Sequence, residues 1–320
     1  MSTARQQIGR VYGDRFRASQ PKLFPPGIVA HCQRLACMTR ADMRERDWKP
    51  RKRGGAARGD RPREPSRRSS RTPATRAPLP VRRDGAVILY GLHTVKAALD
   101  NPARRLYKLY ATENAARRLA EEGVQLRITP EIVRPDAIAA RLGPDAVHNG
   151  LLAEADPLPS PSIDDIAPEG VVLVLDQITD PHNVGAILRT AAGFAASAIV
   201  TTARHSPEAT GVLAKSASGA LEYIPMVVVP NLARALTALQ ERGYLVVGLD
   251  STGDSPLDEV PLRSPLALVL GAEGKGLRQL TRATCDAVAR LDLPGRIKSL
   301  NVSNAAALAL YVATKQLADG

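Results

Sequence analysis

The predicted fold of this chain depends most on the stretch Val171-Val-Leu-Val-Leu175 and on the Asp176-Gln-Ile-Thr-Asp-Pro-His-Asn183 that follows it. Five consecutive apolar residues are typical of a strand that is buried on both faces, as in a parallel sheet. The polar turn then leads into a helix, because apolar residues recur from Val184 onward at the spacing of one helical face. Asn183 stands where we expect the cap of that helix. The stretch therefore predicts a strand, a polar loop and a helix in succession.

The same alternation continues through the C-terminal part of the chain. Further strands are predicted at residues 198–202, 226–229, 244–249 and 266–270, and a helix at residues 232–242. Strands that alternate with helices favour a parallel sheet covered by helices. We therefore expect an α/β domain over residues 171–320.

A smaller α/β domain is expected over residues 86–156. Its predicted strands are residues 87–90, 105–111, 125–128 and 151–154, and its predicted helices are residues 93–99, 115–122 and 132–142. Residues 157–170 contain four prolines and no strong period, which is typical of a linker. Residues 1–85 are rich in Arg, Pro, Gly and Ser and hold too few apolar residues for a core, so we expect a disordered extension.

The charge of the chain is concentrated at its N-terminus. Residues 1–84 hold 22 of the 44 Lys and Arg but only 7 of the 32 Asp and Glu. A basic arm on a near-neutral body favours contact with a polyanion, nucleic acid first. A solvated tail, a later true start at Met38 or Met43, and an organelle transit peptide are the alternatives. We expect a cytoplasmic protein, or an organellar one if residues 1–85 include a transit peptide.

Several classes of site are not expected. The three cysteines form no C-x-x-C pair and the five histidines are scattered, so neither a disulfide framework nor a metal site is predicted. No run of about 18 apolar residues occurs, so no transmembrane helix is predicted.

Three loops should meet at the carboxyl ends of the parallel strands, where ligands of such sheets bind. They are Asp176–Asn183, Gly271–Gly276 and Leu293–Asn304. The glycine loop is neither G-x-G-x-x-G nor a P-loop, which argues against a nicotinamide cofactor and a nucleoside triphosphate. The third loop carries Ser and Asn residues directly before an apolar helix pattern, and a helix N-terminus suits an anionic ligand.

Together the three loops resemble the SpoU (TrmH) family of RNA 2′-O-ribose methyltransferases, within the SPOUT superfamily. The residues that carry the resemblance are Asp180-Pro-His-Asn-Val-Gly-Ala-Ile-Leu-Arg-Thr-Ala191, Leu268-Val-Leu-Gly-Ala-Glu-Gly-Lys-Gly-Leu277 and Leu293–Asn304. The segments Tyr90–Val95 and Val147–Leu151 are similar to the two ends of the family's small RNA-binding domain.

The resemblance implies an S-adenosylmethionine-dependent enzyme with a trefoil knot in its C-terminal domain. It also implies a homodimer with the site near the subunit interface. A separate small domain is more typical of the ribosomal RNA members, so a guanosine of large-subunit ribosomal RNA is the expected substrate. A transfer RNA ribose methyltransferase and a non-catalytic RNA-binding assembly factor are the alternatives.

The resemblance also assigns roles to residues of this sequence. The residues that match the family's cofactor pocket are Gly271, Leu291 and Leu300, and those that match its catalytic and RNA-positioning residues are Asn183, Arg189, Glu273, Ser299 and Asn301. The chain departs from the family's Ile-Pro-Met-x-Gly before the third loop, where it has Leu291-Asp-Leu-Pro-Gly295. Our hypothesis is that Arg189 holds the 3′-side phosphate and stabilises negative charge on the 2′-oxygen, with Glu273 orienting the guanidinium.

Overall fold

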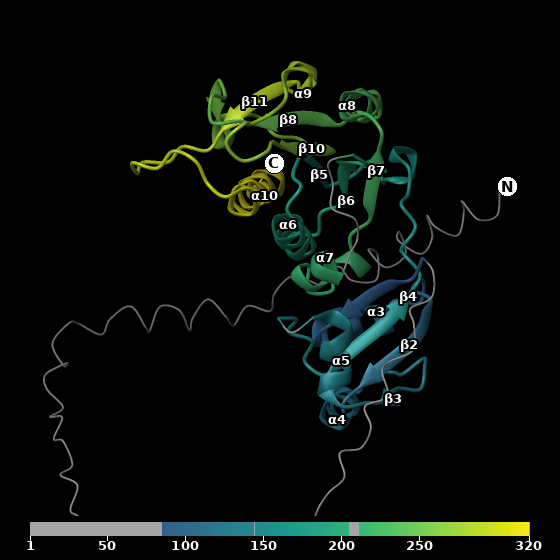
Figure 1. The fold of residues 1–320 in the computed structure, drawn as a ribbon. Helices are drawn as coiled ribbons and strands as arrows, with labels where there is room; N and C mark the ends of the chain where they lie inside the picture. The colour runs from purple at the N-terminus through teal and green to yellow at the C-terminus, as the bar shows by residue number, and fades with distance from the viewer. Residues whose placement is uncertain (1–84, 144, 205–210, 320) are drawn as a thin grey trace, which may run out of the picture. The chain divides into compact units, whose positions relative to one another are not determined.

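The structure is a computed structural model that describes residues 85–143, 145–204 and 211–319. Disorder and RNA contact are expected for residues 1–85. Apart from Gly85, these residues lie outside the described ranges. Figure 1 shows that the described chain forms two α/β domains, each with its own sheet. No helix in the described ranges combines the length and the apolar character needed to cross a membrane.

The first domain is a four-stranded sheet with helices. Its elements are β1 (Val87–Tyr90), α3 (Leu92–Asp100), β2 (Leu106–Ala111), α4 (Glu113–Glu121), β3 (Glu131–Ile132), α5 (Pro135–Leu142) and β4 (Leu151–Ala155). The strand order is β1-β4-β2-β3, and β4 is antiparallel to both of its neighbours. The expectation of a strand at residues 125–128 is wrong, because the short strand lies at Glu131–Ile132. Residues 125–130 contain Pro130 and connect α4 to β3 without regular structure.

The second domain is the expected parallel sheet with helices on both faces. Its strands are β5 (Val171–Leu175), β6 (Ala198–Thr202), β7 (Met226–Val229), β8 (Leu245–Leu249), β9 (Ser255–Pro256), β10 (Leu266–Leu270) and β11 (Ala287–Arg290). They pair in parallel in the order β7-β6-β5-β10-β8-β11-β9. The central strands β5 and β10 are buried along their whole length, as their apolar runs predict.

Two groups of helices cover the two faces of this sheet (Figure 1). They are α6 (Pro181–Gly193), α7 (Gly211–Ser216) and α10 (Val302–Asp319) on one face, and α8 (Leu232–Glu241) and α9 (Gln279–Thr284) on the other. The first group shares a core with alternate residues of β5 and β10, and α8 packs on the residues between them. Helix α10 also packs against α6, through a buried stripe that includes Ala306, Ala309 and Ala313. Short side chains allow two helices to approach closely, and this places the start of α10 beside α6.

The cap of α6 differs from the sequence expectation. The helix begins at Pro181, and its cap is Asp180, whose side chain accepts from the N–H of His182 at 3.0 Å. Asn183 is therefore not the cap but lies in the first turn. Proline is favoured at the first helical position, because its missing N–H would have no partner there. The sequence reading missed this meaning of Pro181 and placed it in the turn.

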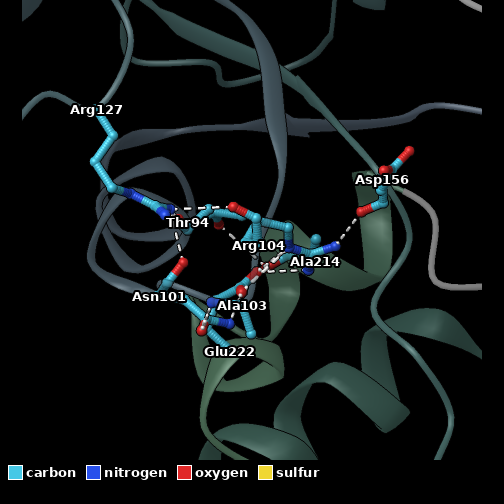
Figure 2. Close-up of polar contacts among 9 residues, drawn as sticks. Thr94, Asn101, Ala103, Arg104, Arg127, Asp156, Ala214 and Glu222 are labelled. Carbon is cyan, nitrogen blue, oxygen red and sulfur yellow. Dashed lines mark hydrogen bonds and ion pairs between the residues drawn. The ribbon is translucent and has the colours of Figure 1, made fainter. Parts of the chain in front are cut away.

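A buried polar cluster joins the two domains, and Figure 2 shows it in close-up. Glu222, in the 3-10 helix η2 (Ala220–Glu222) of the second domain, accepts from Asn101 Nδ2 at 2.7 Å and from Arg104 Nε at 3.0 Å. The side chains of Arg104 and Glu222 are only 3% and 2% exposed. Arg104 also donates to the carbonyl of Asp156 at 2.7 Å. We call Asn101, Arg104 and Glu222 the Glu222 cluster.

Candidate active site

The loops after β5 and β10 border a hollow of about 450 Å³ at the carboxyl ends of the parallel strands. The lining residues are Gln177, Ile178, Thr179, Asp180, Asn183, Ala272, Glu273, Lys275 and Val302. Two of the three predicted loops thus face one hollow, and the third reaches it where α10 begins. Because β5 and β10 are neighbours in register, their ends bring segments about a hundred residues apart to the same place.

Glu273 is the hub of the polar groups at this hollow. Its Oε1 accepts from Asn183 Nδ2 at 3.2 Å, from Asn301 Nδ2 at 2.9 Å and from the N–H of Val302 at 3.1 Å. Asn301 Nδ2 also donates to Asn183 Oδ1 at 2.9 Å. One residue from each predicted loop therefore meets the other two. We call Asn183, Glu273 and Asn301 the Glu273 cluster.

Asn301 couples this cluster to the start of α10. Its Oδ1 accepts from the N–H of Ser303 at 2.9 Å and from the hydroxyl of Ser303 at 2.5 Å. Its carbonyl accepts from the N–H of Ala305 at 3.0 Å, so Asn301 caps the helix. The sequence predicted a Ser/Asn cap in this loop. The structure identifies Asn301 as that cap, and the carboxylate of Glu273 as a partner of the first helical N–H group, which favours negative charge.

The glycine loop is fixed by its backbone and by one carboxylate. A Cβ on Gly271 would lie 2.3 Å from the carbonyl carbon of Gly276, so this close turn requires glycine. Gly276 has a φ of 65°, and a Cβ there would lie 2.5 Å from Asp250 Oδ2. Burial alone would raise the pKa of Asp250, but hydrogen bonds from Thr252 and the N–H of Leu277 bring it below its ordinary value. An ionised Asp250 thus anchors the end of the loop.

Asp250 and Asp176 are positioning residues that the sequence reading did not single out. Asp176 is fully buried directly after β5 and accepts from Arg278 Nε at 2.6 Å and from the N–H of the same residue at 3.0 Å. This pair ties the segment that follows the glycine loop to the end of β5. Their position in the sequence could have identified them, because each aspartate is the first charged residue after a buried apolar strand.

Arg189 and Ser299 lie outside the Glu273 cluster. Arg189 is exposed on α6, and within the described ranges no hydrogen bond or ion pair joins it to Glu273. The expected orienting contact from Glu273 is thus not made in the single chain, where that carboxylate is held by two amides instead. Ser299 is exposed in the loop before α10.

The residues matched to a cofactor pocket are less concentrated. Gly271 directly precedes Ala272, which lines the hollow. Leu291 is half-buried and packs against the main core, and Leu300 is half-buried beside Asn301. Neither leucine lines the hollow. The moved proline at Pro294 belongs to the exposed part of this loop. Their assignment to the cofactor stays a prediction from the resemblance.

The arrangement can hold a polar substrate beside an apolar wall. Among the described residues, the hydrogen bonds to the Glu273 carboxylate all go to Oε1, so Oε2 is free to accept from a ligand hydroxyl or guanidinium. Ile178, Ala272 and Val302 supply apolar surface in the same hollow. Its volume lies in the range of about 300–1,000 Å³ that is usual for small-molecule and cofactor sites.

Comparisons with protein families and curated proteins agree with these loops. The model of the SpoU rRNA Methylase family matches residues 170–311, and the model described as RNA 2′-O ribose methyltransferase substrate binding matches residues 88–161. A Pseudomonas putida protein named 23S rRNA (guanosine-2′-O-)-methyltransferase RlmB is 37% identical over 239 residues, which cover 71% of this chain and 96% of that protein. A protein of the same name from Ralstonia nicotianae is 37% identical over 240 residues, 72% of this chain and 95% of that protein.

Solved structures share the fold. The SpoU methyltransferase AviRb from Streptomyces viridochromogenes, in complex with the cofactor AdoMet, has a TM-score of 0.63 and 23% identity, covering 72% of this chain and 90% of that chain. An AdoMet-bound rRNA methyltransferase from Sinorhizobium meliloti has a TM-score of 0.61 and 23% identity, covering 73% and 88%. At these identities the likeness concerns the fold alone.

Proposed function

This chain belongs to the SpoU family of RNA methyltransferases, and we propose that it transfers a methyl group from S-adenosylmethionine to a ribose 2′-hydroxyl of a guanosine in 23S ribosomal RNA. The two relatives described above, each 37% identical over about 240 residues, carry that activity in their names. The observation from the structure that supports the proposal most directly is the Glu273 cluster, in which one residue of each family motif contacts the others.

The hollow beside Gly271 fits part of a small organic cofactor, while Leu291 and Leu300, which also match the family's cofactor pocket, lie outside it. Its volume of about 450 Å³ and its apolar residues Ile178 and Val302 suit an uncharged ring or chain, while Glu273 and Asn183 can hold polar groups. When bound, S-adenosylmethionine supplies an electrophilic methyl group on a sulfonium. The task of the chain is to bring a ribose hydroxyl into line with that methyl group and to help remove one proton.

We assign the positioning of the ribose to the Glu273 cluster and the charge stabilisation to Arg189. Glu273 Oε1 is fixed by three N–H donors, so its second oxygen has a defined place from which to accept a hydrogen bond. Arg189 lies on α6, as Asn183 does, and its guanidinium is exposed. The charge of this guanidinium can hold the 3′-side phosphate and stabilise developing charge on the 2′-oxygen. Guanidinium stays protonated at neutral pH, so Arg189 acts as a cation and not as the base.

We propose that RNA is also held by the substrate-binding domain, residues 88–161, and by the basic residues 1–84. Contacts to phosphates make the affinity depend on salt. Deletion of residues 1–84 is expected to weaken RNA binding mostly at low salt and to flatten the dependence of log K on log salt. Binding of S-adenosylmethionine should not change. Filter binding of ribosomal RNA at four or more salt concentrations checks this, and an unchanged slope would argue that this segment makes no phosphate contact.

We further infer a homodimer that acts in the cytoplasm, where ribosomal RNA is made in bacteria. Support comes from α10, which exposes Leu308 (44%) and Tyr311 (53%) on the face that does not contact the core. Replacing both by glutamine should shift the mass measured by light scattering from dimer to monomer. A wild-type protein that is monomeric at micromolar concentration would contradict the dimer.

The proposed activity is tested by methyl transfer. The purified protein is incubated with S-adenosylmethionine carrying a labelled methyl group and with separated, unmodified ribosomal and transfer RNA, and the product is mapped for 2′-O-methyl nucleotides. Label in one guanosine of the large-subunit RNA supports the proposal. Label in transfer RNA changes the substrate but not the chemistry. No label in either RNA, with the cofactor bound, would support a non-catalytic RNA-binding factor.

The role of Arg189 is tested in the same assay. Arg189→Ala and Arg189→Lys should each lose turnover by about 10²–10³-fold, the usual cost of removing one charge-stabilising donor. The melting temperature should stay near that of the wild type, because the side chain is exposed. Arg263→Ala is the matched control, since Arg263 is also exposed but lies before β10, at the opposite edge of the sheet. Near-wild-type turnover of Arg189→Ala would refute the assignment.

A further inference from the structure

A second hollow, of about 260 Å³, lies at the carboxyl ends of β6 and β7. Its lining includes Thr202 at the end of β6, and Asn231, Leu232 and Ala233 at the start of α8. Asn231 caps this helix, and its side chain accepts from the N–H of Arg234 at 3.2 Å. The N–H groups of the first helical residues have no acceptor within the helix, so they suit an anion.

Thr202 gives an independent sign of a ligand in this hollow. The residue is 5% exposed, and its Oγ1 is buried with no hydrogen-bond partner within the described ranges. A buried hydroxyl without a partner is costly, and such groups in native structures call for an explanation. A ligand with acceptor atoms in the hollow would provide the missing partner, since Thr202 lines it.

Two arginines make the hollow electropositive. Arg204 is exposed at its rim, and Arg278 lines it from the segment before α9. Arg278 uses its Nε to bind the buried Asp176, and its side chain remains 41% exposed. Within the described ranges no hydrogen bond involves its two terminal nitrogens. Among the described residues that line the hollow there is no carboxylate, and the Asp176 carboxylate is matched by Arg278, so Arg204 leaves an excess positive charge.

This second hollow is adjacent to the candidate active site. Asp176, which binds Arg278, is followed directly by Gln177, Ile178 and Thr179, and these three residues line the first hollow. Strands β5 and β6 are paired neighbours, so both hollows open at the same edge of one sheet. Helices α6 and α10 border the first hollow and α8 and α9 border the second, so an RNA strand that reaches both has to cross this edge of the sheet.

We propose that the hollow formed by Thr202, Arg204, Arg278 and the N-terminus of α8 binds a backbone phosphodiester of the substrate RNA, a few nucleotides from the methylated ribose. Phosphate oxygens accept hydrogen bonds, carry the charge that two arginines and a helix N-terminus favour, and can accept from the Thr202 hydroxyl. The inference rests on the proposed function, because it takes RNA as the source of the phosphate.

Thr202→Val tests the site without changing its shape or charge. Because the hydroxyl has no partner in the free protein, its removal should raise the melting temperature, by about 2 to 4 °C. The same change should reduce the stabilisation that inorganic phosphate gives, measured by thermal shift against sodium chloride of equal ionic strength. A variant less stable than wild type would show that the hydroxyl already has a partner, and this would overturn the proposal.

Arg204→Gln tests the charge. Its affinity for large-subunit ribosomal RNA should fall several-fold at low salt, and the slope of log K against log salt should decrease in size by about one. KM for RNA should rise more than kcat changes, and S-adenosylmethionine affinity should stay constant. Arg263→Gln removes the same charge from an exposed position at the opposite edge of the sheet, and it should leave the slope and KM unchanged.

The outcomes separate this inference from the proposed function. If wild type methylates ribosomal RNA but Arg204→Gln keeps the wild-type slope and KM, the phosphate site is wrong and the function stands. If wild type methylates no RNA while Thr202→Val and Arg204→Gln both lose the phosphate-induced shift, an anion site exists and its RNA origin is wrong. Loss of slope in Arg263→Gln as well would mean that the effect is general charge, which also overturns the site.

Discussion

Two glutamates of this protein, Glu222 and Glu273, each accept hydrogen bonds from residues far away in the sequence, yet their surroundings differ. Glu222 is buried and accepts from the guanidinium of Arg104 and the amide of Asn101 (Figure 2). Glu273 is exposed at a hollow and accepts from the amides of Asn183 and Asn301. The first carboxylate accepts from a positively charged side chain, whereas the hydrogen-bond donors to the second are neutral.

The difference separates a structural contact from a binding contact. A buried carboxylate requires a positive partner, and once paired with Arg104 at both oxygens it has nothing left to offer a ligand. A carboxylate held at one oxygen by neutral donors keeps its charge and its second oxygen for a ligand. The identity of the donors, more than their number, distinguishes the two sites.

The largest expected effect comes from breaking the buried pair. Glu222→Gln leaves the charge of Arg104 buried without a counter-charge, and such a change typically costs about 3–5 kcal/mol of folding free energy. The measurement is chemical denaturation followed by circular dichroism. The double variant Arg104→Met with Glu222→Leu should recover much of this loss, because it removes both buried charges together.

An exposed ion pair provides the control for that experiment. Lys96 and Glu122 are 2.8 Å apart and each side chain is about one third exposed. Glu122→Gln removes a carboxylate just as Glu222→Gln does, but water can solvate the remaining lysine, so the loss of stability should be far smaller. Equal losses for the two variants would contradict the assignment of the Glu222 cluster as a buried structural joint.

A smaller effect on stability, but a clear one on activity, is expected at Glu273. Glu273→Gln removes the charge and keeps the shape, so turnover should fall by about 10²-fold, whereas the free energy of unfolding should change by no more than about 0.5 kcal/mol. Methyl transfer and denaturation of the same preparation check both. Glu241→Gln is the matched control, because Glu241 is exposed at the end of α8. Turnover equal to wild type would place Glu273 outside the active site.

The smallest effect concerns the Cys285 thiol, whose pKa is raised by burial more than it is lowered by the nearby Arg282. Burial, with the nearby carboxylates of Asp286 and Asp176, raises the pKa of the Cys285 thiol to about 12. At pH 8 the folded thiol is protonated, so iodoacetamide should modify Cys285 more slowly in the native protein than in urea, as measured by mass spectrometry of its peptide. Because the folded pKa is the higher one, this contribution to stability is complete below the ordinary thiol pKa and is lost as pH rises toward 12. Equal alkylation rates would contradict it.

The sequence predicted the second domain better than the first. Residues 171–175 and 266–270 are apolar throughout, and such runs have few alternatives to a buried parallel strand, so both strands begin and end where expected. The strand expected at residues 125–128 was wrong, because Gln125-Leu-Arg-Ile128 has only two apolar residues beside Pro130, and so weak a strand preference is overridden by packing. The cap of α6 was misplaced for a similar reason, since Asp180 and Asn183 have equal capping ability and Pro181 decided between them.

The amino-acid sequence alone predicts the parallel α/β fold of the second domain and, through three loop motifs, the residues of the Glu273 cluster. Those properties depend on apolar period and on local residue types, which are written along the chain. Three other features depend on how the chain packs: Glu222 pairs with Arg104, Asp176 anchors Arg278, and Thr202 faces a second hollow. The first two contacts join residues 118 and 102 positions apart, and Thr202 lies where separate strands end together; no local preference encodes which distant partner a buried charge or hydroxyl will meet.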